Sequence, residues 1–230
     1  MTDLPTFPVR PAGAPAAAHR EDGTDRDAGR LLVIACGAIA RELIEVARLD
    51  GFEGVEVTAL PADLHNRPEQ IPRRVRERIR AARGRYARIL VGYADCGTGG
   101  HLDRVCEEEG VVRLPGAHCY ELFAGAATFA ALHEEEPGTF YLTDYLVRHV
   151  DALVFAGLGL DAHPELTPLY FGNYRRVVYL AQTDDPALDR RARAAAARLG
   201  LTYERRDTGY GELPAAFGRA TSRLPVVVGR

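Results

Sequence analysis

Short apolar runs alternate with amphipathic stretches from residue 30 onward. The apolar runs predict strands at 31–35, 55–60, 86–93, 111–114, 139–142, 176–181 and 201–205, and an edge strand at 225–228. Between these runs, apolar residues recur every three or four positions, which predicts helices at about 40–50, 69–82, 101–106, 119–132, 145–153 and 186–199. Strands and helices therefore alternate along most of the chain.

This alternation predicts an α/β protein. Helices that connect successive strands at short spacing are typical of a mainly parallel sheet with helices on both faces, a Rossmann-like three-layer sandwich. We expect residues 30–230 to form a single α/β domain, or alternatively two lobes that meet near 140–160. Residues 1–29 are rich in proline, alanine, glycine and charge, which predicts a disordered N-terminal lead-in.

The composition limits the classes of function. Among 230 residues, 29 are Lys or Arg and 32 are Asp or Glu, which gives a formal net charge of −3. This charge gives no electrostatic reason to expect a nucleic acid as partner. Every one of the Lys or Arg positions is arginine, so lysine Schiff-base chemistry and a P-loop lysine are excluded.

The sequence also shows no membrane or secretion signal. It has no run of the roughly 20 apolar residues that a membrane span requires. Charged residues interrupt positions 10–27, which leaves no apolar core for a signal peptide. We therefore expect a cytoplasmic protein that contacts no membrane, with a homodimer as the default oligomer.

Three of the four cysteines fall at predicted strand-to-helix junctions. Cys36, Cys96 and Cys119 follow the first, third and fourth strands, and His65 and His118 accompany the second and fourth. The carboxyl ends of parallel strands share one edge of a sheet, where ligands bind. The fourth cysteine, Cys106, lies inside a predicted helix and is interpreted as a packing residue.

These junction residues predict a metal site. Thiolate sulfur and imidazole nitrogen are ligands of zinc and iron. Cys36, Cys96 and Cys119 supply the three protein ligands typical of a catalytic zinc ion, or three ligands of a [4Fe-4S] cluster with one open iron. His65 or His118 is the substitute or fourth ligand. Isolated, half-buried thiols without a metal are the alternative.

Two metal-free alternatives use the same residues. Cys96 precedes a glycine-rich turn at a predicted helix start, where the helix dipole lowers the pKa of a thiol. It is therefore a candidate nucleophile or acid/base, with His118 or His65 as its partner base. Cys36 and Cys96 together are a candidate pair of proton-shuttling thiols, as in a racemase-like mechanism.

The turn after Cys96 is a candidate substrate site. A glycine-rich turn at a helix start is typical of loops that bind an anion, such as the phosphate or carboxylate group of a substrate. The residues assigned to substrate binding are Gly97, Thr98, Gly99, Gly100 and Asn66. The turn lacks the lysine of a Walker motif, and the first strand is not followed by GxGxxG. A tight turn that simply requires glycine is the alternative.

Five blocks of the chain resemble one known family. They are CGAIARE at 36–42, LHNRP at 64–68, DCGTGG at 95–100, GAHCYE at 116–121 and EPGTF at 136–140. Together they resemble the domain of unknown function 1638 family over about residues 30–212. Members occur in anaerobes and methanogens, some near corrinoid-dependent methyl-transfer systems, in which zinc thiolates activate thiols and iron–sulfur proteins reduce corrinoids. The resemblance thus implies a corrinoid or methyltransferase protein as a partner.

Three hypotheses of function follow. The first is a zinc- or iron–sulfur-dependent enzyme, of transferase or lyase type, that acts on a small anionic or thiol- or methyl-bearing metabolite. Its catalytic residues are Cys96, His118 and His65. The second is a metal-free enzyme that uses Cys96. The third is a non-catalytic protein that handles a metal or a corrinoid for a methyl-transfer system.

Overall fold

The structure is a computed structural model that describes residues 6–8 and 30–225. The chain divides into two compact units, which we call unit 1 (Met1–Cys119 with Leu213–Arg230) and unit 2 (Tyr120–Glu212). The divisions fall at 119/120 and 212/213, whereas the sequence suggested lobes that meet near 140–160. The last helix belongs to unit 1, so unit 2 is an insertion between two segments of unit 1.

Unit 1 contains a five-stranded sheet with the order β1-β3-β2-β4-β5. Its strands are β1 (Thr6–Pro8), β2 (Leu31–Cys36), β3 (Val55–Leu60), β4 (Arg88–Gly92) and β5 (Val112–Arg113). β2 pairs in parallel with β3 and β4, and β4 pairs in parallel with β5, whereas β1 is an antiparallel edge strand. From β2 the chain moves to β3 on one side and then to β4 on the other. The strand order therefore reverses between β2 and β4.

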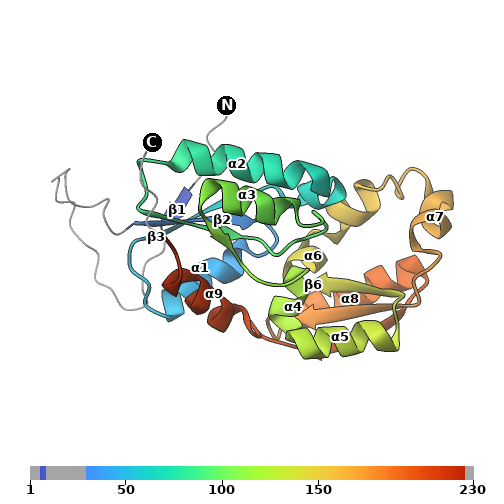
Figure 1. Ribbon diagram of the computed structural model, residues 1–230. Helices are drawn as coiled ribbons and strands as arrows, with labels where there is room; N and C mark the ends of the chain where they lie inside the picture. The colour runs from blue at the N-terminus through green and yellow to red at the C-terminus, as the bar shows by residue number, and fades with distance from the viewer. Residues whose placement is uncertain (1–5, 9–29, 226–230) are drawn as a thin grey trace. The chain divides into compact units, whose positions relative to one another are not determined.

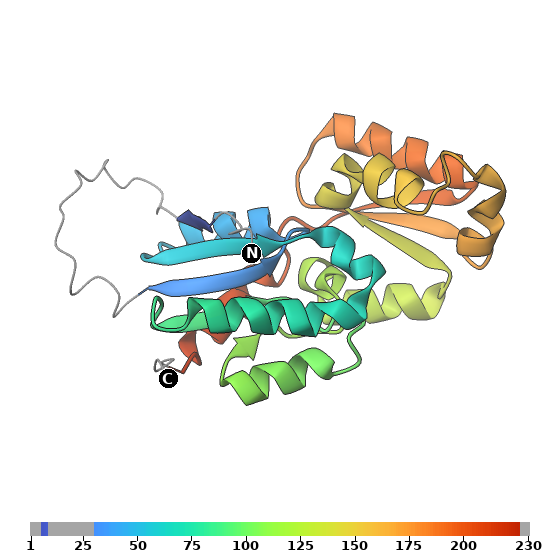
Figure 2. The same ribbon diagram turned by 90° about the horizontal axis from the view of Figure 1, so that it is seen from above.

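Helices cover both faces of this sheet (Figure 1). α2 (Ile71–Ala82) and α3 (His101–Glu109) lie on one face, and α1 (Ala40–Leu49) and α9 (Leu213–Ser222) lie on the other. In Figure 2, α2 runs alongside the strands of unit 1. Two short 3-10 helices, η2 (Ala62–Asn66) and η3 (Pro68–Gln70), connect β3 to α2. β2 is buried along its whole length, as expected of a central parallel strand covered on both faces.

Unit 2 contains a three-stranded parallel sheet with the order β6-β7-β8. Its strands are β6 (Thr139–Thr143), β7 (Arg176–Ala181) and β8 (Thr202–Asp207), and its helices are α4 (Cys119–Ala124), α5 (Ala126–Glu135), α6 (Asp144–Arg148), the π-helix η4 (Asp151–Ala156), the 3-10 helix η5 (Pro164–Leu166), α7 (Thr167–Phe171) and α8 (Pro186–Leu199). α4 begins at the last residue of unit 1 and continues into unit 2.

Alternate residues of β7 pack on opposite faces of the second sheet, as the two-residue period of a strand requires. Val177 and Tyr179 belong to a core that includes residues of α6, α7 and α8. Val178 and Leu180 belong to a second core with residues of α4 and α5. Figure 2 shows α8 and α5 on opposite sides of this sheet, so unit 2 is also covered on both faces.

The predicted α/β class is confirmed, although the strands do not form one purely parallel Rossmann-like sheet. The strands are divided between a mixed five-stranded sheet and a parallel three-stranded one. Thr6–Pro8, inside the predicted disordered lead-in, form β1. The rest of that lead-in, and most of the predicted strand at 225–228, lie outside the described residues. In the described part of the chain, none of the helices is both long and apolar enough to cross a membrane.

Candidate functional site

Two of the cysteines lie where the strand order of unit 1 reverses. Cys36 is the last residue of β2, and Cys96 comes shortly after β4, the neighbouring strand. In α/β sheets, ligands bind in the crevice at the carboxyl ends of the strands at such a reversal. His65 lies in η2 after β3, and Cys119 comes after β5. The loops after all four parallel strands therefore contribute to one edge of the sheet.

Two main-chain hydrogen bonds connect the loop after β4 to the loop after β5. The N–H of Asp95 donates to the carbonyl oxygen of Gly116 at 3.0 Å, and the N–H of Cys96 donates to that of Ala117 at 2.8 Å. The main-chain N–H of Cys119 is directed at the thiol of Cys96. The backbone of the two loops therefore holds Cys96 next to Cys119.

The backbone of Cys96 is strained. Its φ is 53°, and within residues 6–8 and 30–225 it is the only non-glycine residue with a positive φ. Such a conformation costs about 1–3 kcal/mol and tends to occur at functional sites. Gly97, Gly99 and Gly100 also have positive φ, which explains why glycine is needed in this turn. The strain makes Cys96 a candidate functional position independently of its chemistry.

The thiols of Cys36, Cys96 and Cys119 interact electrostatically in all three pairs. Burial raises the pKa of Cys36 to about 12 and the pKa of Cys96 to about 11. Burial also raises the pKa of Cys119 well above its ordinary value, and the other two thiols raise it further, although Cys119 keeps part of its surface exposed. All three thiols are therefore protonated at neutral pH in the structure as it stands.

His65 lies beside Cys36 with one ring nitrogen available. Its Nδ1 lies 3.0 Å from the carbonyl oxygen of Ala62 and 3.8 Å from Sγ of Cys36. Because a carbonyl only accepts, we infer that Nδ1 carries the hydrogen and that Nε2 is an acceptor. Burial lowers the pKa of His65, the bond to Ala62 opposes this effect, and nearby His118 reinforces it. His65 is therefore neutral at pH 7, and the exposed His118 lies close to it.

The glycine-rich turn is occupied by a side chain of its own loop. The carboxylate of Asp95 accepts hydrogen bonds from Gly99 N–H at 3.1 Å, from Gly100 N–H at 2.9 Å and from Thr98 Oγ1 at 2.6 Å. Burial opposes ionisation of Asp95, but these bonds and Arg113 more than offset it and lower its pKa. A substrate anion would have to displace Asp95, so we do not carry the anion-binding hypothesis forward for this turn. Gly97 and Asn66 are exposed.

Tyr93 was not predicted as part of this site. It follows β4 directly and lies next to Cys36, because Ala35 pairs with Gly92. Its hydroxyl is buried and directed at the thiol of Cys36, and it makes no hydrogen bond of ordinary geometry with the described residues. Its ring stacks on His65 with centroids 6.2 Å apart. Burial and then the thiols of Cys36 and Cys96 raise the pKa of Tyr93. The sequence did offer one signal for Tyr93, since it is a polar aromatic residue at the end of the strand predicted at 86–93.

Glu42 is the second residue that was not predicted. It lies in the first turn of α1 and is buried. Its charge adds to the effects that raise the pKa of Cys119, after burial and the other two thiols. Acidic residues are common in the first turn of a helix, so nothing in the sequence distinguished this one. The buried surroundings of the thiols thus include an additional acidic group.

The side chains at this edge include ligand types that suit a soft metal, but their arrangement in the described residues does not form a metal site. Cysteine and histidine side chains select zinc or iron. Within the part of the chain that the structure describes, no group of three or more His, Cys, Asp or Glu side chains has an arrangement that could hold a metal ion. The fit depends on the types of ligand and on the proximity of the three thiols. Cys106 is buried separately in α3, and burial raises its pKa to about 12.

Comparison with known families gives one match. Residues 59–216 match the family described as "Protein of unknown function (DUF1638)". This range includes His65, Cys96, His118 and Cys119, whereas Cys36 and its block lie before it. Comparisons with curated proteins and with solved structures found no match. Because the family match covers more than half of the chain, this protein belongs to the DUF1638 family.

Proposed function

We propose that this protein is a metal-thiolate enzyme in which Cys36, Cys96 and Cys119 hold a zinc ion or a [4Fe-4S] cluster. Its substrate is a small anionic or thiol- or methyl-bearing metabolite, and its reaction is of the transferase or lyase type. The proposed site lies at the carboxyl edge of the unit 1 sheet, where β2 and β4 end.

The observation that supports this proposal most is the proximity of three thiols that are all protonated. A cysteine that reacts as a free thiolate usually has a pKa lowered by a nearby cation or helix dipole. Here burial raises the pKa of each thiol, and the buried Glu42 adds to the effect at Cys119. Buried charges in proteins are paired or coordinate metals. A bound metal is therefore the simplest source of the positive charge that would turn these thiols into thiolates.

Other groups of the chain suit the roles of donors to those thiolates. The N–H of Ala38 donates to Sγ of Cys36 at 3.3 Å, and the N–H of Cys119 is directed at the thiol of Cys96. Hydrogen bonds to a charged acceptor are stronger than those to a neutral one. In the proposed state these donors stabilise the charged sulfur atoms and fix their positions, and the hydroxyl of Tyr93 is a third donor of this kind.

The two histidines suit proton transfer. A metal bound here would polarise the substrate or lower the pKa of a thiol or water that it binds. In the proposed enzyme, His65 accepts a proton at Nε2 or serves as a fourth ligand, since its Nδ1–H is directed at Ala62. The exposed His118, close to His65, exchanges the proton with solvent.

Metal analysis tests the proposal. The protein, Cys96→Ser and Cys106→Ser are purified without oxygen, and zinc, iron and the visible absorbance are measured. We expect about one zinc ion or one cluster per chain in the protein and in Cys106→Ser, and a large loss in Cys96→Ser. Visible absorbance distinguishes a cluster from zinc. Near-zero metal in all three proteins would exclude the proposal.

A metal-free nucleophile at Cys96 is the second candidate, which the strained backbone of Cys96 favours. Its pKa of about 11 is against it, because only about one thiol in 10,000 would then be ionised at pH 7. Alkylation with iodoacetamide separates the two candidates in metal-free protein. Fast modification of Cys96 alone would favour the nucleophile, and uniformly slow modification of all four cysteines would exclude it.

A further inference from the structure

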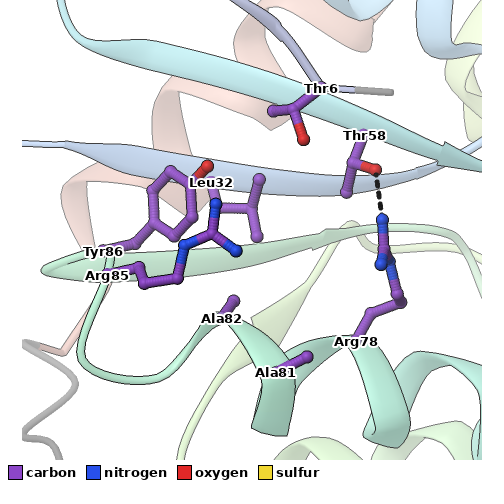
Figure 3. Close-up of a pocket in the computed structure, with 8 residues that line it drawn as sticks. All are labelled: Thr6, Leu32, Thr58, Arg78, Ala81, Ala82, Arg85 and Tyr86. Carbon is purple, nitrogen blue, oxygen red and sulfur yellow. Dashed lines mark hydrogen bonds between the residues drawn. The ribbon is translucent and has the colours of Figure 1, made fainter. Parts of the chain in front are cut away.

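Unit 1 has a concave site between α2 and the sheet (Figure 3). Arg78, Ala81 and Ala82 border it from α2, and Arg85 borders it from the loop that follows. Positions 78, 81 and 82 lie on one side of the helix. The two small alanines between two long arginines leave a hollow above the sheet.

This hollow is separate from the thiol site. Leu32 of β2 lines it, four residues before Cys36 on the same strand. At the rise of a parallel strand, four residues span about 13 Å. A ligand in the hollow would therefore not reach the thiols unless it were long.

Two arginines, Arg78 and Arg85, flank the hollow. Among the residues that the structure describes, none of those lining it is acidic. Nη2 of Arg78 donates to Oγ1 of Thr58 at 3.1 Å, which orients this guanidinium group above the sheet. Figure 3 shows the guanidinium groups of Arg78 and Arg85 on either side of the hollow.

Arg85 differs from other arginines of this region. Arg73, Arg76 and Arg80 of α2 form ion pairs with Glu77, Glu108 and Glu109 respectively. Arg85 instead lies over the ring of Tyr86, with its guanidinium carbon 5.9 Å from the ring centroid. No carboxylate of residues 6–8 and 30–225 forms an ion pair with it. The nearby Glu56 already accepts from the Tyr86 hydroxyl at 2.7 Å and pairs with Arg30.

We propose that this hollow binds the carboxylate or phosphate group of a small metabolite, with Arg85 and Arg78 as its cationic contacts. A guanidinium group presents several N–H donors in a plane, a geometry that matches carboxylate and phosphate oxygens. The hydroxyl of Thr6 borders the same space and offers a further donor, and Leu32 and Ala82 provide apolar contacts for the carbon part of a ligand. The proposal does not depend on a metal at the thiol site.

Calorimetric titration with two probes, inorganic phosphate and malonate, tests the proposal in a chloride buffer of low ionic strength. We expect saturable binding of at least one probe. Arg85→Gln is expected to weaken it about tenfold or more, and Arg85 is exposed, so its replacement leaves the fold intact. Arg73→Gln, on α2 but away from the hollow, is the control and is expected to bind as the unchanged protein does.

The two probes distinguish the two sources of the anion, since the tighter one identifies the class of ligand. Arg78→Gln, checked by thermal unfolding, is a second variant and is expected to weaken binding as well. Absence of saturable binding for both probes would overturn the proposal. Equal weakening in Arg85→Gln and Arg73→Gln would also overturn it, because it would indicate general attraction to an arginine-rich surface.

Discussion

Replacing Tyr93 with phenylalanine should have opposite effects on the metal-free and the metal-bound protein. The substitution keeps the ring that stacks on His65 and removes only the hydroxyl. That hydroxyl is buried and makes no hydrogen bond of ordinary geometry with the described residues. An unsatisfied buried hydroxyl costs about 1–3 kcal/mol. Tyr93→Phe should therefore raise the unfolding free energy of the metal-free protein by about 1 kcal/mol or more.

The metal-bound protein should respond in the other direction. Once Cys36 is a thiolate, its sulfur becomes an acceptor for the neighbouring hydroxyl. Loss of a hydrogen bond to a metal ligand lowers metal affinity about 10–100-fold, which corresponds to about 1.4–2.7 kcal/mol. No purely structural role of Tyr93 predicts a more stable protein that binds metal more weakly.

Two measurements on the same samples test this prediction. Thermal unfolding with a chelator should show a rise of about 2–4 °C for each kcal/mol gained, and zinc competition against a chromophoric chelator gives the affinity. Tyr141→Phe in β6 is the matched control, because the Tyr141 hydroxyl is also buried and makes no hydrogen bond of ordinary geometry with the described residues, but belongs to unit 2. It should gain stability and leave zinc affinity unchanged. A less stable Tyr93→Phe, or unchanged zinc affinity, would refute the reasoning.

Three further predictions concern protons and stability. Zinc binding at pH 7 should release about three protons, and about two in Cys119→Ser, because burial keeps the cysteines protonated; titration in weakly buffered solution counts them. Gly211→Ala should destabilise the protein far more than Gly209→Ala in thermal unfolding, because both have positive φ but a Cβ at Gly211 would lie 2.0 Å from the Phe123 oxygen. Because the pKa of Asp95 is lowered from 3.8, the ionised carboxylate should stabilise the fold fully above pH 3.8, and this stabilisation should be lost as the pH falls through the lowered pKa. In acid unfolding, Asp95→Ala should therefore lose less stability over this pH range than the unchanged protein does.

The secondary structure was predictable where the sequence pattern is strong. The bounds predicted for β3, β7 and α8 agree with the structure, because a bounded apolar run or a capped amphipathic stretch defines each of them. The predicted helix over 119–132 is instead two helices. Gly125, between them, has φ of 81°, and a glycine inside an apolar pattern does not reveal its φ beforehand.

The division into two sheets was not predictable from these patterns. Hydrophobic periodicity gives the type of an element but not its partner, and β5 and β6 read as successive strands of one sheet. β6 in fact pairs with β7 in unit 2. α9 also returns to unit 1 from the far end of the sequence. Long-range pairings of this kind depend on packing, not on local sequence.

Part of the candidate site was predictable from the same sequence patterns. Strand-to-helix junctions can be located from the sequence, so Cys36, Cys96 and Cys119 could be assigned to one edge of a sheet. That β2 and β4 are neighbours became known only from the strand order. Tyr93 could not be assigned to the site without it, because the contact between Tyr93 and Cys36 depends on the register of Ala35 with Gly92.

The conformation of Cys96 adds a separate reason to place function at this edge. Position 96 is the one place in this turn where a residue with a positive φ is not glycine; the others are Gly97, Gly99 and Gly100. Glycine there would avoid strain of about 1–3 kcal/mol, so packing alone does not explain a cysteine. The main-chain N–H groups of Cys119 and Ala94 are directed at this thiol and partly oppose the effect of burial on its pKa. Of the three thiols, only Cys96 has a positive φ, as expected of the sulfur on which the chemistry depends.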